Sequence, residues 1–288
     1  MISGAKARAV MHGAISIVNA LATGKGSALG ISLKVVAEVE VTQGRGVNFA
    51  QGNNRNRLIN NIVQNTMPIE IIEANLITIK VSSEIPIGYG LKSSSAVSNA
   101  VALACSKLAK REDVNDYKIL EAAVRSSLDA KVSFTGAYDD ATACYFGGFT
   151  VTDNTSRTLI RTERAPEGLN AVIFLPRNIA RGDVRKLNNL SDIFMDAFGL
   201  AEAGQYWKAM KLNGVLASAA LSSRYAPAMA ALENGAISAS MSGNGPSIAA
   251  VAYENNVEAI KLALSKFDGQ IIISKVNNQK ANVDIIDG

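Results

Sequence analysis

A glycine- and serine-rich segment carries the residue types that bind phosphate, Pro86-Ile87-Gly88-Tyr89-Gly90-Leu91-Lys92-Ser93-Ser94-Ser95-Ala96. Gly88 and Gly90 allow a tight bend and a close approach of the backbone to a ligand. The serines add hydroxyl groups where a helix is expected to begin. Because the first turn of a helix presents unpaired N–H groups and a positive dipole end, the segment predicts a cradle for a polyphosphate. An ordinary helix cap after a turn is the alternative.

Acidic residues are the best candidates for acid–base chemistry. The chain has a single histidine, His12, which excludes a multi-histidine metal site and disfavours a serine–histidine–aspartate triad. Proton transfer must therefore fall to carboxylates or lysines. Asp139 and Asp140 are adjacent and precede the glycine pair Gly147-Gly148. By itself, such a pair of carboxylates is typical of a solvated turn.

Composition narrows the classes of protein. At 288 residues the chain is long enough for a large core and two packed subdomains. With 48% hydrophobic and 19% charged residues it is typical of a soluble globular protein, and no apolar run reaches a membrane-spanning length. We therefore expect a cytoplasmic protein whose Cys105 and Cys144 are reduced. Scattered basic residues carry the net charge of +4, which favours a small anionic ligand over nucleic acid or a membrane.

The elements around the glycine–serine segment follow from hydrophobic periodicity. Residues 76–82 alternate between apolar and polar and predict a strand, as do residues 28–42. After the segment, apolar residues at helical spacing predict a helix through Leu108, and a second helix is expected over 116–130. Residues 44–65 are polar and predict a loop with a short helix. The segment therefore joins a strand to a helix.

The second half of the chain predicts a smaller unit. A strand over 170–175 is followed by helical residues 187–232, and a final helix and strand are expected near 257–267 and 270–276. Between them, strands 236–241 and 246–253 are joined by the turn Ser242-Gly243-Asn244-Gly245. Strand, helices, hairpin, helix and strand in this order indicate an α/β sandwich like a ferredoxin-like lobe. Its boundary with the first half falls within 153–168.

These motifs resemble those of the GHMP small-molecule kinases, which include galactose, homoserine, mevalonate and phosphomevalonate kinases. The family's second motif, PxxxGLGSSAA, is similar to residues 86–96, except that Lys92 replaces the central glycine and Ser95 the first alanine. The third motif is similar to Ser242-Gly243-Asn244-Gly245-Pro246-Ser247, and the first to the stretch around Gly13. Two motifs in the right order are far more specific than either alone.

The resemblance implies an α+β fold with two lobes. Residues 1–160 would form an N-terminal ATP-binding lobe like the second domain of a ribosomal small-subunit protein, and residues 161–288 a C-terminal ferredoxin-like lobe. Within the family, residues 90–95, 14–20 and the turn at 23–26 are similar to the archaeal branch that phosphorylates shikimate in aromatic amino-acid biosynthesis. That likeness implies ATP and Mg²⁺ as cofactors and shikimate as an anionic acceptor.

The family's functional residues can be carried over position by position. The resemblance implies that residues 86–96 bind the triphosphate, that Ser94 and Asp129 bind Mg²⁺, and that Asp140 orients the acceptor hydroxyl and takes its proton. Asp139 is the rival for that last role. The cation that polarises the hydroxyl would be Arg8, with Lys6 nearby, although an arginine cannot readily exchange a proton.

The acceptor carboxylate needs a cationic partner. Candidates are Arg177 and Arg181, which would share a helix face with Arg185, and Lys25 in the early glycine turn. Gly243, Asn244 and Gly245 are expected to pack against the phosphate-binding segment. Homoserine or a mevalonate-pathway alcohol is the alternative acceptor, and a nucleotide-binding regulator without turnover or a nucleic-acid-binding module is the alternative class. We expect a monomer or a homodimer.

Overall fold

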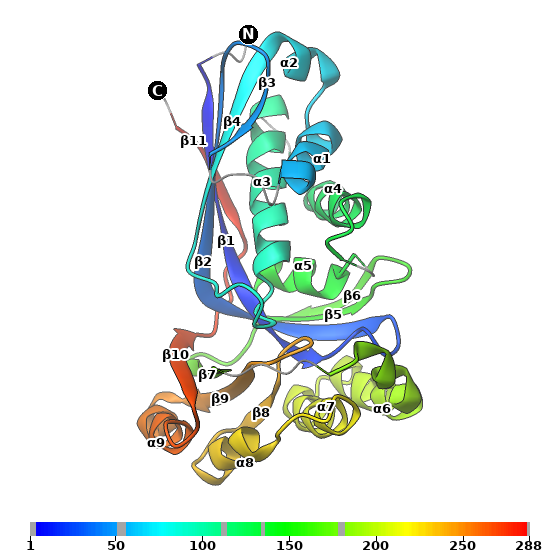
Figure 1. Cartoon of the computed structure of the whole chain (residues 1–288), viewed down its shortest axis with the longest axis vertical. Coiled ribbons are helices and arrows are strands. Elements are labelled where there is room, and N and C mark those ends of the chain that lie inside the picture. Colours follow the sequence, from blue (N-terminus) through cyan, green and yellow to red (C-terminus); the bar gives the residue numbers. More distant parts are fainter. Residues whose placement is uncertain (1–3, 51–55, 111–113, 134–135, 178–181, 287–288) are drawn as a thin grey trace.

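The protein is elongated and contains two β-sheets, each covered by helices (Figure 1). The computed structural model describes residues 4–50, 56–110, 114–133, 136–177 and 182–286. Within these residues, no helix combines the length and the apolar character needed to cross a membrane.

The first sheet has the strand order β11-β1-β2-β4-β3. Its strands are β1 (Lys6–Val18), β2 (Lys25–Gln43), β3 (Gly46–Phe49), β4 (Asn75–Ser83) and β11 (Asn282–Ile286). The alternation of apolar residues in β2 and β4 fixes their antiparallel register, which pairs Val39 with Ile79 and keeps both side chains fully buried. The beginning of β2 also pairs with β5 (Phe149–Asp153), which continues into β6 (Thr158–Glu163).

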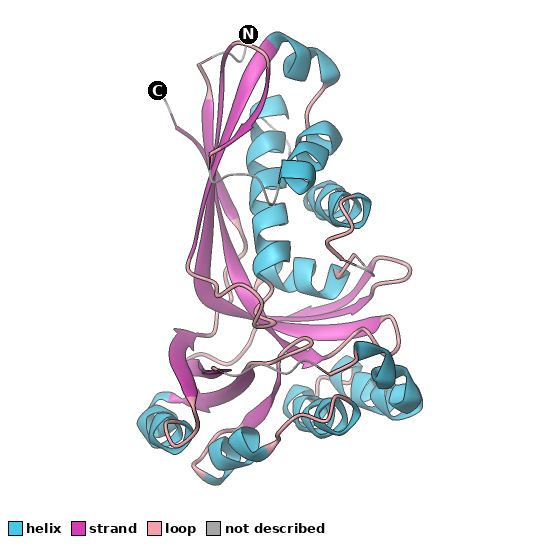
Figure 2. Cartoon of the chain, in the orientation of Figure 1, coloured by secondary structure: helices cyan, strands magenta, loops and turns pink. Residues whose placement is uncertain are grey.

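Five helices lie on one face of this sheet in the described part of the chain (Figure 2): α1 (Asn56–Thr66), α2 (Ile69–Ala74), α3 (Ser93–Lys110), α4 (Asp116–Asp129) and α5 (Tyr138–Phe146). The central helix α3 packs against β1 and β2 on one side and against α1, α4 and α5 on the other. Four of its alanines, Ala96, Ala100, Ala102 and Ala104, are fully buried. Small side chains allow these neighbours to approach α3 closely, so the helix is fixed from several directions.

The second sheet has the antiparallel order β10-β7-β9-β8. Its elements in chain order are β7 (Leu169–Pro176), the 3-10 helix η2 (Val184–Leu190), α6 (Ser191–Glu202), α7 (Tyr206–Ala220), α8 (Ala226–Glu233), β8 (Ser238–Met241), β9 (Ile248–Tyr253), α9 (Glu254–Leu264) and β10 (Gly269–Lys275). The expected succession of strand, helices, hairpin, helix and strand is therefore confirmed. The central strands β7 and β9 are almost entirely buried.

The sheets differ from the sequence-based expectation in two ways. Residues 44–65 contain the expected short helix, as most of α1, and also the strand β3, which was not expected. The last strand, β11, leaves the second half and pairs with β1, matching Ala9 to Val283. The predicted boundary between residues 160 and 161 falls inside β6, which pairs with β5 of the first sheet. The long-range pairing of β11 was missed because local periodicity does not reveal a strand's partner.

The sheets meet where three backbone segments approach one another. The Gly30 amide donates to the Gly148 carbonyl at 2.9 Å, the Gly148 amide to Asn277 at 2.7 Å, and the Asn277 amide back to Gly30 at 2.9 Å. A Cβ on Gly30 would lie 2.8 Å from the Asn277 carbonyl oxygen. Glycine is therefore required at this junction, which holds β5 and the segment after β10 beside β2.

Candidate active site

The glycine–serine segment forms the expected loop between β4 and α3, and α3 begins at Ser93. Gly88, Gly90 and Lys92 have φ angles of 85°, 77° and 67°, in the left-handed region that favours glycine. The loop borders a cavity of about 270 Å³. The lining of the cavity comes from three parts of the chain. They are the loop itself (Pro86, Ile87, Gly88, Gly90, Leu91, Lys92, Ser93, Ser94 and Ser95), the region from α4 to α5 (Ser127, Val132, Ser133, Gly136, Ala137 and Asp140) and the turn between β8 and β9 (Gly243, Asn244 and Gly245).

The turn between β8 and β9 packs directly on this glycine–serine loop, named the phosphate-binding loop here for the role predicted from its sequence. A Cβ on Gly90 would lie 2.0 Å from the Ser242 carbonyl oxygen, so only glycine permits the contact. Ser242 Oγ donates to the Gly90 carbonyl at 2.8 Å, and Ser247 Oγ donates to the Tyr89 carbonyl at 2.5 Å. The expected packing of Gly243, Asn244 and Gly245 beside the loop agrees with this geometry.

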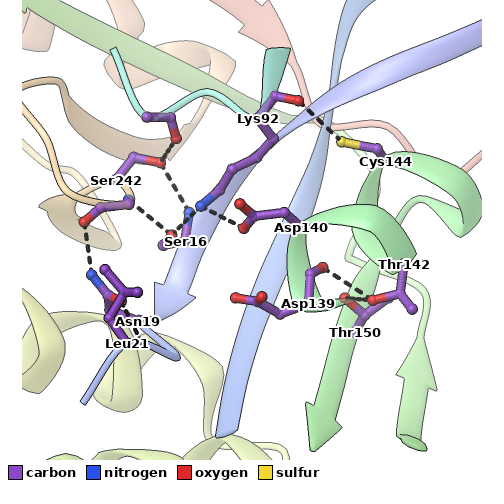
Figure 3. A network of polar contacts seen from close by, with 12 residues as sticks. Ser16, Asn19, Leu21, Lys92, Asp139, Asp140, Thr142, Cys144, Thr150 and Ser242 are labelled. Carbon is purple, nitrogen blue, oxygen red and sulfur yellow. Dashed lines mark hydrogen bonds and ion pairs between the residues drawn. The ribbon is translucent and has the colours of Figure 1, made fainter. Parts of the chain in front are cut away.

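The end of β1 joins the same contact (Figure 3). The Gly243 amide donates to Ser16 Oγ at 2.9 Å, and the Ser16 amide donates to Ser242 Oγ at 3.1 Å. Asn19 Nδ2 donates to the Gly243 carbonyl at 2.9 Å. Ser16 and Asn19 are buried, so these hydrogen bonds are shielded from water and fix the turn against the first sheet.

Asp140 faces the cavity from the first turn of α5 and contacts a buried lysine. Its Oδ1 lies 2.7 Å from Lys92 Nζ, which also donates to Ser16 Oγ at 2.8 Å (Figure 3). The Lys92 side chain is only 4% exposed. Burial alone would lower the pKa of Lys92, but the carboxylates of Asp140 and Asp139 offset it and the pKa is raised. Lys92 is therefore a cation at neutral pH.

Asp139 is buried and points elsewhere. Its Oδ1 accepts a hydrogen bond from Asn154 Nδ2 at 2.7 Å, and a Cβ on Gly26 would lie 2.7 Å from its Oδ2. Burial and then the charge of Asp140 raise the pKa of Asp139 to about 6, against the lowering influence of Lys92 and Asn154. Asp140 lines the cavity whereas Asp139 does not. This arrangement favours Asp140 over Asp139 as the group that meets a substrate.

Two of the residues expected at the site lie elsewhere. Arg8 is exposed on β1, and its Nε lies 3.9 Å from Glu38 Oε1. Ser16 stands eight positions later on the same strand, which places the two residues roughly 26 Å apart along β1. Asp129 ends α4, is exposed and pairs with Arg125 at 4.0 Å. The structure therefore supports neither Arg8 as the cation beside Asp140 nor Asp129 as a metal ligand. Ser127, one half-turn earlier on α4, lines the cavity instead.

The candidates for an acceptor's carboxylate are dispersed. Lys25 Nζ lies 4.0 Å from Asp153 Oδ2 and 5.5 Å from the centroid of the Phe198 ring, and its neighbour Gly26 contacts Asp139. Arg177 is exposed and pairs with Asp268 at 3.5 Å. Arg181 lies outside the described residues. Of the two described candidates, Lys25 is the one whose chain neighbour, Gly26, lies beside Asp139.

Sequence reasoning missed the roles of Ser16, Ser242 and the Lys92 ammonium. A signal for Lys92 was present, because a lysine stands where the resembled motif has glycine. The serines carried no such signal, since their importance comes from long-range contacts.

Comparison with known proteins agrees with the fold. The family described as "GHMP kinases N terminal domain" matches residues 57–148, and the one described as "GHMP kinases C terminal" matches residues 206–269. The first match includes the phosphate-binding loop, Asp139 and Asp140. The chain belongs to the GHMP kinase family, so it is a kinase.

Curated relatives are similar over almost the full length. A shikimate kinase from Methanobrevibacter smithii is 36% identical over 285 residues, covering 92% of this chain and 95% of that protein. One from Methanocella arvoryzae is 37% identical over 281 residues, covering 96% of each. The crystal structure of mevalonate kinase from Methanococcus jannaschii superposes with a TM-score of 0.75 at 17% identity, covering 94% of this chain and 98% of that one.

Gly90→Ala should weaken nucleotide binding. The added methyl group would overlap the Ser242 carbonyl and push the turn off the phosphate-binding loop. Overpacking of this kind costs about 1–3 kcal/mol, which corresponds to a roughly 5- to 150-fold weaker affinity for ATP if the cost falls on the bound state. Calorimetric titration with a non-hydrolysable ATP analogue measures it. Gly46→Ala is the matched control, because Gly46 also has a positive φ but nothing within 4 Å; equal affinities in the two variants would contradict the prediction.

Asp139→Asn should increase stability at neutral pH. The pKa of Asp139 in the folded protein, about 6, exceeds the unfolded value, so the folded state loses stability as pH rises from about 4 to 6. The Asp139→Asn variant does not lose this stability. The difference in free energy of unfolding between the variant and the native protein should therefore grow between about pH 4 and 6, to at most about 3 kcal/mol, and then level off. Urea unfolding at several pH values measures it.

Asp183→Asn provides a control of opposite sign. Hydrogen bonds from Arg185 lower the pKa of Asp183 to about 2, so this variant should lose stability above pH 4. If the gain in unfolding free energy from Asp139→Asn is the same at pH 4 and pH 7, the result would contradict a raised pKa for Asp139 in the folded protein.

Proposed function

We propose that the protein transfers the γ-phosphoryl group of ATP to a hydroxyl of shikimate, giving shikimate 3-phosphate and ADP. The observation that carries this proposal is the identity of 36–37% to proteins named shikimate kinase over more than nine-tenths of the chain. The Asp140 carboxylate facing the cavity beside the phosphate-binding loop is the feature such a transfer needs. A cytoplasmic role in aromatic amino-acid biosynthesis is part of the same proposal.

The phosphate-binding loop would hold the triphosphate. The first turn of α3 offers backbone N–H groups and a positive dipole end at the cavity. Ser93 Oγ is buried and has no hydrogen-bond partner within the described part of the chain, although Ser93 lines the cavity. A phosphate oxygen would satisfy this hydroxyl, whose isolation otherwise costs free energy.

Mg²⁺ fits this cavity only with help from the nucleotide. No cluster of three or more His, Cys, Asp or Glu side chains suited to a metal occurs among the described residues. The half-buried hydroxyl of Ser94 lines the cavity, and Mg²⁺ commonly takes few protein ligands alongside phosphates and waters. We assign Ser94 as the protein ligand and leave Asp129 out of the metal site. When bound, the ion neutralises charge on the phosphates.

Asp140 would steer the acceptor. Its carboxylate accepts the proton of the attacking hydroxyl while the oxygen forms a bond to the γ-phosphorus, and the bond from that phosphorus to the β–γ bridging oxygen breaks to release ADP. Lys25 and the turn Gly243–Gly245 are proposed to contact the acceptor. Lys25 precedes Gly26, which lies beside Asp139, and the Gly243 amide shares the Ser16 hydroxyl with Lys92, the partner of Asp140. The Lys25 ammonium would attract the shikimate carboxylate.

An acceptor screen tests the proposed function. We expect ADP release with Mg²⁺ and ATP to depend on shikimate, with kcat/KM at least about 100-fold above that for homoserine or mevalonate, because a site that pairs with a substrate's polar groups rejects analogues that cannot use them. Coupled ADP release and phosphorus NMR of the product measure it. Turnover of homoserine or mevalonate in preference to shikimate would assign another acceptor, and ADP release from none would favour a regulator.

Asp140→Asn should abolish most turnover without removing the nucleotide. Loss of a positioned base lowers kcat by about 100-fold or more, whereas the phosphate-binding loop and the fold are unchanged. Steady-state kinetics together with ATP titration separate the two effects. Asp284→Asn, which removes an exposed carboxylate on β11 outside the cavity, is the control; near-native kcat in Asp140→Asn would transfer the role to another group.

A further inference from the structure

Lys92 occupies a backbone position that suits glycine rather than lysine. Its φ of 67° lies in the left-handed region, where a residue with a side chain costs about 1–3 kcal/mol. The neighbouring Gly88 and Gly90 adopt similar φ angles without that cost. The buried ammonium adds a desolvation penalty. Two unfavourable features at one residue of a ligand-binding loop indicate that its side chain has a task there.

The contacts of the side chain show what it connects. Lys92 leaves the loop before α3, and its Nζ contacts Asp140 of α5 at 2.7 Å and Ser16 of β1 at 2.8 Å. The same Ser16 hydroxyl accepts the Gly243 amide, and a Cβ on Gly243 would lie 3.4 Å from Lys92 Nζ (Figure 3). One ammonium group therefore lies at the meeting point of the phosphate-binding loop, β1, α5 and the turn after β8.

We propose that Lys92 is the positioning residue for Asp140, holding its carboxylate toward the acceptor and fixing it relative to the loop that binds the triphosphate. The inference rests on the proposed transfer to an alcohol and does not depend on which alcohol is used. In this proposal the cation beside the Asp140 carboxylate is Lys92 of the phosphate-binding loop. The family resemblance alone had assigned that cation to Arg8 of β1. The ion pair joins the loop proposed to bind ATP to Asp140, the proposed base for the acceptor hydroxyl. A displacement of the loop would therefore also displace Asp140.

Replacing Lys92 with glycine is the sharpest test of the proposal. Glycine removes the ammonium and relieves the backbone strain, so a loss of activity cannot be blamed on the φ angle. We expect kcat to fall by about 100-fold, the effect of a displaced catalytic group, while KM for ATP changes by less than about threefold. Ethylamine or methylamine should restore part of the activity in a saturable way, by entering the space between Asp140 and Ser16.

Two further variants separate positioning from general damage. Lys92→Met keeps the length of the side chain without its charge and should show the same fall in kcat. Lys280→Met is the matched control, because Lys280 pairs with Asp116 at 2.6 Å outside the cavity; its kcat should stay within twofold of the native value. Near-native kcat in Lys92→Gly and Lys92→Met, or activity that no amine restores in Lys92→Gly, would overturn the proposal.

A stability cycle tests the ion pair independently of the acceptor. Lys92→Met and Asp140→Asn should each lower Tm, because each leaves the charge of the other residue poorly compensated. The Tm of the double variant should be no lower than that of the less stable single variant. Tm losses that simply add would mean that the two side chains do not act as a pair, which overturns the inference. If the native enzyme fails to phosphorylate shikimate but the Tm losses do not add, the proposed acceptor is wrong and the pairing of Lys92 with Asp140 stands.

Discussion

A buried ammonium group is stable only where the chain surrounds it with acceptors, and this requirement governs the arrangement of the site. Lys92 finds Asp140 and Ser16 on elements far apart in sequence. Both acceptors depend on the packing of α3, because α3 contacts β1 on one side and α5 on the other. The buried alanines of α3 set those distances. The packing of the first sheet against α3 and α5 thus determines whether Lys92 and Asp140 can form their ion pair.

The second constraint is the close approach of backbones from the two sheets. Gly90 and Ser242 come so near that a single methyl group would overlap a carbonyl oxygen. Hydrogen bonds from Ser242 and Ser247 to carbonyls of the phosphate-binding loop then hold the contact. Because the turn of the second sheet rests on this loop, a displacement of the loop would also displace the turn. A similar glycine contact at Gly30 fixes β2 beside β5.

Local sequence patterns were sufficient for what depends on neighbours in the chain. Alternation predicted β2 and β4, helical spacing predicted α3, and the glycine turn predicted the hairpin of β8 and β9. They failed where distant segments decide, as for β11, which extends the first sheet from the end of the chain. Arg8 illustrates the same limit, since its place in the sequence suited a catalytic cation but its strand carries it far from Ser16. Spacing ranks candidates, and packing decides which of them meet.

Asp139 and Asp140 show how packing assigns different chemistry to neighbouring residues of one type. Consecutive side chains on a helix point in different directions, so at the start of α5 one carboxylate faces the cavity and the other faces β2. Asn154 holds Asp139 in place from the segment after β5, and Lys92 holds Asp140 from the phosphate-binding loop. Burial and then the charge of Asp140 raise the pKa of Asp139, and the charge of Lys92 opposes that rise. Packing therefore gives Asp139 a buried amide partner and leaves Asp140 at the cavity, held by the ammonium of Lys92.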